Sequence, residues 1–154
     1  MNKKVWWKGF FWSINLLFLA ILLGFSGVAS ATTMNAENLD HLAAGETIEG
    51  PGFFAGNVVK VDGNVEGTTF VSGQDVRING NINGDLFVAS QTITISGTVT
   101  GNIYGAGQAL TFDGQSESDV FFAGQSISIG QDASIGRDLF AAGATILQEG
   151  IIQR

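Results

Sequence analysis

From Gly50 onward, hydrophobic and polar positions repeat along the chain with a period of 17 residues. Six units are present, beginning at Gly50, Gly67, Gly84, Gly101, Ser118 and, after two extra residues, Arg137. Within a unit the apolar residues are spaced by two, as in Ile93 and Ile95, and no stretch keeps a helical period. Each unit is therefore predicted to form about three short strands, joined at corners where glycines stand.

A single unit is too short to close a sheet of its own, but it is long enough for one turn of a triangular coil. Stacked coils would pair each strand in parallel with its equivalents about 4.8 Å above and below, and stability would come from this stacking. We expect an all-β fold, a single-stranded parallel β-helix of about six 17-residue coils over residues 47–154. Thr47–Glu49 matches the last strand of a coil, and residues 32–46 are expected to be a linker or cap.

One aromatic residue recurs three residues into every unit. This row is Phe53, Phe70, Phe87, Tyr104, Phe121 and Phe140. We predict that the row points inward and stacks as a core ladder, with small residues beside it at Ala55, Ser72, Ala89, Ala106 and Ala123. The residues flanking the ladder would then point outward as an apolar stripe for lateral pairing or membrane contact, at Leu86, Ile103, Val120 and Leu139.

The sixth unit ends in Ile151 and Ile152, whereas a soluble solenoid normally carries a polar capping unit at its end. An open coil presents unpaired N–H and C=O groups, which are a template for another strand. We therefore predict end-to-end assembly at Ile151 and Ile152. A truncated fragment of a larger surface protein is an alternative interpretation.

The first residues have the pattern of an export signal. Lys3, Lys4 and Lys8 precede an apolar run over residues 10–25, and small residues follow as far as Ala31. Residues 1–31 are predicted to be a secretory signal peptide that is cleaved after Ala31, or a membrane anchor that is retained. Either way, everything after Ala31 is expected outside the cytoplasmic membrane.

Charge and composition exclude several classes of function. All 14 acidic residues lie beyond Ala31 against four basic ones, which leaves this part of the chain with a net charge of −10. A nucleic-acid partner is not expected, because phosphate binding needs Lys and Arg. The chain has 22 glycines, one proline and no cysteine, so disulfides and Cys-ligated metals are excluded.

Candidate chemistry is sparse. His41 is the chain's one histidine and lies outside the repeats, so we predict no enzyme and no cofactor. A left-handed acyltransferase solenoid is disfavoured for the same lack of a base. Asp85, Asp119 and Asp138 share one corner position and would suit calcium, but a solvated corner is the favoured interpretation.

The unit Gly84-Asp85-Leu86-Phe87-Val88-Ala89-Ser90-Gln91-Thr92-Ile93-Thr94-Ile95-Ser96-Gly97 resembles the repeats of bactofilins, the polymer-forming cytoskeletal proteins of bacteria. The resemblance covers roughly residues 46–150 and implies a right-handed β-helix that assembles end to end without nucleotide, often at a membrane. The export signal departs from the family's cytoplasmic pattern and favours a cell-envelope scaffold. The expected partners are further copies of the chain, a membrane through an uncleaved N-terminal segment, and cell-wall components. An exported adhesin or glycan-binding solenoid is the alternative.

Overall fold

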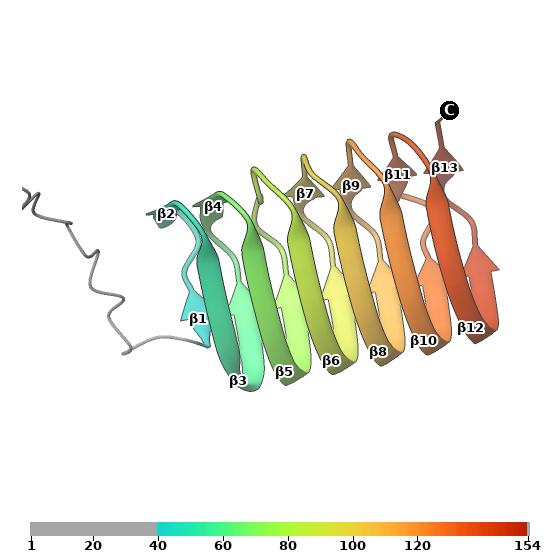
Figure 1. Cartoon of the computed structure of the whole chain (residues 1–154), viewed down its shortest axis with the longest axis horizontal. Coiled ribbons are helices and arrows are strands. Elements are labelled where there is room, and N and C mark those ends of the chain that lie inside the picture. The colour runs from blue at the N-terminus through green and yellow to red at the C-terminus, as the bar shows by residue number, and fades with distance from the viewer. Residues whose placement is uncertain (1–39, 154) are drawn as a thin grey trace, which may run out of the picture. The chain divides into compact units, whose positions relative to one another are not determined.

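The computed structural model describes residues 40–153, which form a parallel β-solenoid without helices (Figure 1). The predicted signal peptide or anchor, the stretch 32–39 and Arg154 lie outside the described residues. Within residues 40–153, no helix is long and apolar enough to cross a membrane.

Each complete coil contains one ten-residue strand, and every complete coil but one also contains a short strand. The long strands are β3 (Gly52–Val61), β5 (Thr69–Ile78), β6 (Leu86–Ile95), β8 (Ile103–Phe112), β10 (Val120–Ile129) and β12 (Leu139–Gln148). The short strands are β2 (Thr47–Glu49), β4 (Asn64–Glu66), β7 (Thr98–Val99), β9 (Gln115–Ser116), β11 (Ser134–Ile135) and β13 (Ile151–Ile152). Between β4 and β7, isolated bridges at Ile82 take the place of a short strand. A two-residue strand, β1 (His41–Leu42), precedes them all.

The strands stack in parallel and in the register that the repeat predicts. The long strands form one sheet in the order β1-β3-β5-β6-β8-β10-β12, and equivalent residues such as Phe87 and Tyr104 are partners. Thr47 pairs with Asn64, which confirms a partial coil ahead of the first complete one. The prediction of an all-β parallel solenoid is confirmed, and β1 adds a seventh strand to the long sheet from within the expected linker.

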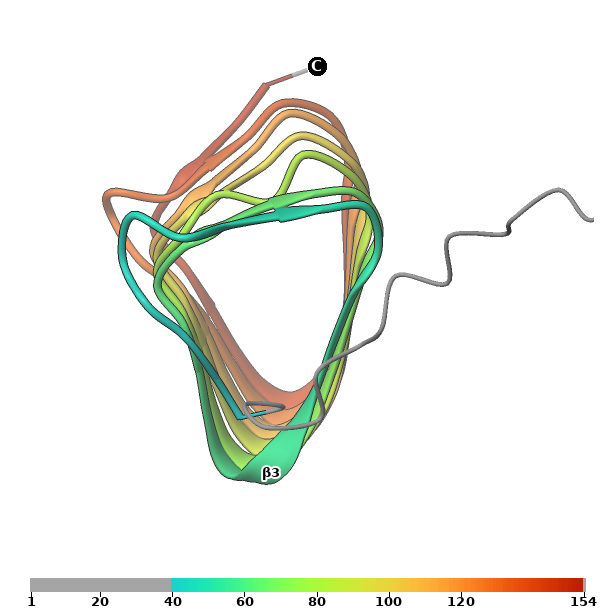
Figure 2. The ribbon, with the colours of Figure 1, turned by 90° about the vertical axis from the view of Figure 1, so that its left-hand side faces the viewer.

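Each long strand bends in its middle, which gives the coil the triangular outline seen in Figure 2. In β8 the inward residues are Ile103 and Gly105 before the bend, and Leu110 and Phe112 after it. The alternation of buried and exposed residues breaks over 107–109, because the strand turns the corner at Gly107 and Gln108. One strand therefore forms two walls of the triangle, which we call the first and second walls. The short strands form the third.

Rows of mainly aliphatic side chains from all three walls fill the interior, with Phe54, Phe112 and Phe122 among them. The buried side chains in one central coil are Leu86, Val88, Ile93, Ile95 and Val99, all at most 4% exposed. The side chain at an inward position can be smaller in one coil when the equivalent side chain in the next coil is larger. A Cβ on Gly105 would lie 2.7 Å from the ring of Phe122, so the missing side chain makes room for that phenylalanine. Such compensation is expected of a close-packed core.

The prediction that the aromatic row faces the core is wrong. Phe53, Phe70, Phe87, Tyr104 and Phe140 are 36–54% exposed, and Phe121 is half-buried. The predicted outer stripe is the actual core, because Leu86, Ile103 and Val120 are fully buried and Leu139 packs against them. Strand alternation places neighbouring residues on opposite sides of a wall. A narrow coil already filled by five aliphatic side chains has no space for a further ring.

At the corners, the backbones of successive coils lie very close together. A Cβ on Gly97 would collide with the carbonyl oxygen of Gly80, the equivalent corner residue one coil earlier. At the same corner the fifth coil contains two extra residues, between β10 and β11, yet β11 still pairs with β9 and β12 still pairs with β10. The corner thus absorbs the insertion without shifting the register.

Candidate functional site

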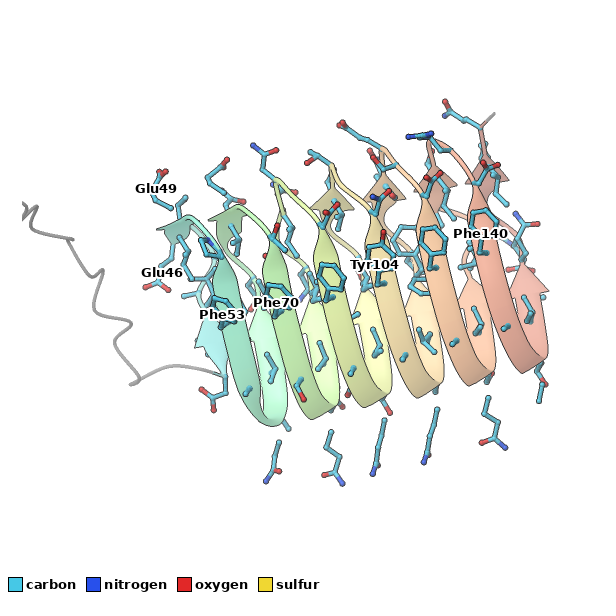
Figure 3. All side chains as sticks on the ribbon, in the orientation of Figure 1. Glu46, Glu49, Phe53, Phe70, Tyr104 and Phe140 are labelled. Atoms are coloured by element: carbon cyan, nitrogen blue, oxygen red, sulfur yellow. The ribbon has the colours of Figure 1, made fainter. Side chains whose placement is uncertain are left out.

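The most distinctive outward feature is the aromatic row on the first wall, which we call the ring ladder. It comprises Phe53, Phe70, Phe87, Tyr104, Phe121 and Phe140. Neighbouring ring centroids lie 4.8–5.2 Å apart with interplanar angles of 4–10°, so the stacking part of the prediction is confirmed. Figure 3 shows the labelled rings following one line across the strands. The parallel register produces this spacing, because each ring sits on the equivalent residue of the next strand.

The geometry of the stack decides which part of each ring is available. Since the rings stack face to face, each inner ring has both faces covered by its neighbours and presents its edge to solvent. Within the described residues, only Phe53 and Phe140 at the two ends have a face without a ring against it. The ladder is therefore a continuous ridge of ring edges.

A groove floored by small side chains runs beside the ridge. The floor consists of the second outward residues of the first wall, Ala55, Ser72, Ala89, Ala106, Ala123 and Ala142, all of them exposed. These residues were expected inside, next to the rings; they keep their place beside the rings but on the outer surface. Two shallow hollows of about 600 and 590 Å³ follow the ridge, and their linings are mainly apolar.

The last coil presents a second apolar surface, at the C-terminal end of the described residues. Ile146, Leu147, Ile151 and Ile152 are 46%, 51%, 63% and 38% exposed. The predicted assembly residues Ile151 and Ile152 thus lie on the outermost strand β13, which pairs with β11. Strand β12 pairs with β10, and its other edge has no partner strand within residues 40–153.

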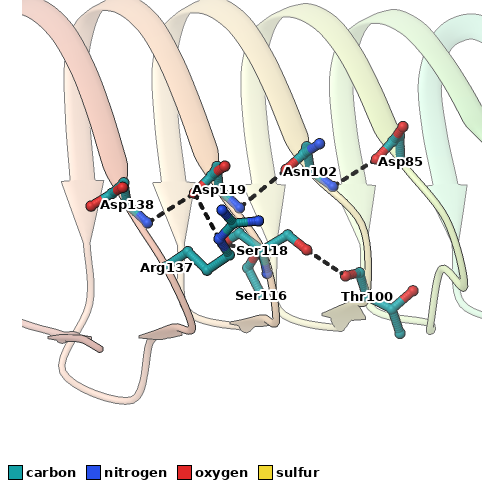
Figure 4. A network of polar contacts seen from close by, with 8 residues as sticks. All are labelled: Asp85, Thr100, Asn102, Ser116, Ser118, Asp119, Arg137 and Asp138. Atoms are coloured by element: carbon teal, nitrogen blue, oxygen red, sulfur yellow. Dashed lines mark hydrogen bonds and ion pairs between the residues drawn. The ribbon is translucent and has the colours of Figure 1, made fainter. Parts of the chain in front are cut away.

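The shared Asp corner is a hydrogen-bond ladder (Figure 4). Asp85 Oδ1 accepts a bond of 2.8 Å from the backbone N–H of Asn102, and Asn102 Oδ1 accepts one from Asp119. Asp119 Oδ1 accepts in turn from the N–H of Asp138, and it lies 3.6 Å from Arg137 Nε. These side chains hold one coil to the next, which is a structural role. In the described part of the chain, no three His, Cys, Asp or Glu residues are grouped to hold a metal ion.

The other candidate polar groups lie on the accessible surface. His41 is an exposed residue of β1, with Lys60 as its strand partner. Arg77 pairs with Asp75 at 3.3 Å on the second wall, where both are accessible to water. No buried side-chain N or O atom among the described residues lacks a hydrogen-bond partner. The candidate functional features are therefore the two apolar surfaces.

Comparison of the chain with protein-family models, with curated proteins and with solved structures finds no match, so its family is not assigned by these comparisons.

Proposed function

We propose that this chain is a non-enzymatic structural protein that assembles end to end into filaments, as an exported scaffold of the membrane or cell envelope. The observation that carries the proposal is the last coil. Ile151 and Ile152 are 63% and 38% exposed, and β12 has an edge without a partner strand in residues 40–153. An edge of this kind is completed by a further parallel strand.

The opposite end of the solenoid offers a strand in the matching position. Residues Ile48, Val65, Ile82, Val99, Ser116, Ile135 and Ile152 form one continuous row through the third wall. If a second copy adds its first coil after β13, its Ile48 takes the next place above Ile152. The hydrogen-bond register built along the stack then continues from one copy into the next.

Two further observations support the proposal. The resemblance of the repeat to bactofilins carries the expectation of end-to-end filaments. In Figure 2 the chain runs clockwise as it recedes from the N-terminal coil, which supports the right-handed winding that this resemblance implies.

The alternative of a glycan-binding solenoid is less well supported. Sugars stack on the faces of aromatic rings, as a cation does on the face of the ring's π-system. In the ring ladder the faces of the inner rings are covered by neighbouring rings at 4.8–5.2 Å. The surface therefore lacks the repeated open platform that such a module needs.

Electron microscopy of the full chain tests the proposal. We expect filaments, and we expect Ile151→Lys combined with Ile152→Lys to shorten or abolish them, because two charges would enter an apolar junction. Both side chains are exposed, so the coil itself should stay folded. The matched control adds the same two charges on the second wall, at Thr92→Lys and Ala109→Lys, which are also exposed. Filaments that survive the end variant, or a wild-type chain that stays monomeric at all concentrations, would contradict end-to-end assembly.

A further inference from the structure

The outward residues of the first wall are almost all apolar, which is unusual for a surface that is only in contact with water. Five of its rings are 36–54% exposed, and its other outward positions are alanines and one serine. With 150–250 Å² of surface per aromatic side chain, the ridge exposes roughly 500 Å². Exposed apolar patches of about this size on monomeric proteins are often functional. With the alanine floor included, the apolar area approaches the ~800 Å² that each partner buries in a stable complex.

The wall is self-complementary in shape, because it carries a ridge and a groove side by side over six coils. A two-fold axis parallel to the stack would turn a second copy to face the first, so that the ridge of each copy enters the groove of the other. A two-fold axis perpendicular to the stack, lying in the plane of the wall, would instead set ridge against ridge. Only the first arrangement fills both grooves, and in it the two stacks run parallel.

The rims of the wall favour the same arrangement by their charge. The corner next to the ridge carries Asp85, Asp119 and Asp138, and the corner next to the groove carries neutral amides. These amides are Asn57, Gln74, Gln91, Gln108 and Gln125, all of them exposed. Within the described residues none of their side chains makes a hydrogen bond that the structure records, so the amide N–H groups are available to carboxylates. In the parallel pair each acidic rim faces an amide rim, whereas the antiparallel pair sets acidic rim against acidic rim.

A lipid surface fits this wall less well. Proteins that lie on membranes usually flank their apolar face with Lys and Arg. Here the one basic residue on either rim is Arg137, and it lies 3.6 Å from Asp119. The net charge of −10 beyond Ala31 also repels anionic headgroups.

We infer that the ring ladder and the alanine groove form a two-fold, self-complementary interface through which two copies of the chain pair side by side with their stacks parallel. The pairing uses a different surface from end-to-end assembly and does not depend on it. A filament with such an interface would consist of paired stacks.

Photo-crosslinking of the full chain in intact cells tests the pairing. Benzoylphenylalanine placed at Tyr104 should give a covalent dimer under illumination. The same probe at Ala109, which is exposed on the second wall of the same coil, should give less than a tenth as much. Equal dimer from both positions, or adducts at Tyr104 only with lipid or with another protein, would overturn the inference.

A matched pair of substitutions tests the groove directly. With the probe at Tyr104, Ala106→Arg should lower the dimer yield at least tenfold, because the long side chain occupies the groove. Ala109→Arg changes the same residue type three positions away and should leave the yield within about twofold. Both positions are exposed, so the substitutions leave the core untouched. An unchanged dimer yield in Ala106→Arg would overturn the inference.

Orientation and independence have their own readouts. A probe at Phe70 should crosslink to partner fragments around Ser72 if the stacks are parallel, and attachment around Ala123 would overturn the parallel arrangement. The pair Ile151→Lys and Ile152→Lys should leave the Tyr104 dimer intact. Dimer without filaments would refute the proposed end-to-end function alone, and filaments without dimer would refute the pairing alone.

Discussion

Adding one hydroxyl to each of two phenylalanines distinguishes an outward ring ladder from an inward one. Phe87 lies in the ladder, stacked on Tyr104 at 4.8 Å, and Phe112 is an inward residue with no exposure. In Phe87→Tyr the new hydroxyl reaches water, as the hydroxyl of a ladder tyrosine does. In Phe112→Tyr it enters the core beside Phe122, whose ring centroid lies 6.0 Å away.

The expected costs follow from this difference. A buried hydroxyl without a partner costs about 1–3 kcal/mol, and overpacking a filled core adds about 1–3 kcal/mol. We therefore expect Phe112→Tyr to lose about 2–6 kcal/mol of unfolding free energy. Phe87→Tyr should stay within about 0.5 kcal/mol of wild type, as exposed substitutions usually do.

Thermal unfolding of the full chain, followed by the β-sheet circular dichroism signal, measures both variants. At about 4 °C per kcal/mol for a domain of this size, Phe112→Tyr should melt roughly 8 °C or more below wild type. Phe87→Tyr should melt within about 2 °C of it. If Phe87→Tyr were the more damaging change, the ladder would face the interior and the assignment of the first wall would be wrong.

Two further predictions concern the corners. Gly97→Ala should destabilise the fold by more than about 1 kcal/mol in the thermal measurement, because the new Cβ would collide with the Gly80 carbonyl. The control Ser96→Ala, at the exposed neighbouring position, should be nearly neutral. Asn102→Ala should cost about 1 kcal/mol in urea unfolding, because the N–H of Asp119 loses its acceptor. The control is Asn81→Ala, whose side-chain amide donates only to the side chain of the half-buried Asn64, and a loss in Asn102→Ala no larger than in this control would contradict the bridging role.

The sequence was sufficient to predict the coil, its parallel pairing and its register, because these depend on a repeat that is visible in every unit. It was not sufficient to assign inside and outside on the first wall. The strand bends at residues such as Gly107 and Gln108, so the alternation that places Leu110 and Phe112 inside cannot simply be counted back to Tyr104. One signal was available in the sizes of the residues. Inward rows change size from coil to coil, as Gly105 and Phe122 do, whereas the stacked row stays aromatic throughout.

For the same reason, the sequence predicts the apolar surface at the end of the last coil but does not predict the groove beside the ring ladder. The exposed position of Ile151 and Ile152 follows from the order of the coils, which the repeat determines. The groove depends on which side of the wall Ala89 and Ala106 occupy, so the error about the rings carried over to it. Neither composition nor spacing indicates that ring edges, rather than ring faces, meet the solvent.

The two-residue insertion in the fifth coil has a consequence for how such a chain can evolve. Because β11 and β12 keep their partners after the insertion, the length of a corner loop is separated from the order of the strands. Gene changes that duplicate a whole 17-residue unit would lengthen the stack by about 4.8 Å, and changes that add a few codons at this corner would decorate its side. Length and surface can therefore be selected independently, and the same corner is the natural place to insert a peptide tag or epitope in an engineered version.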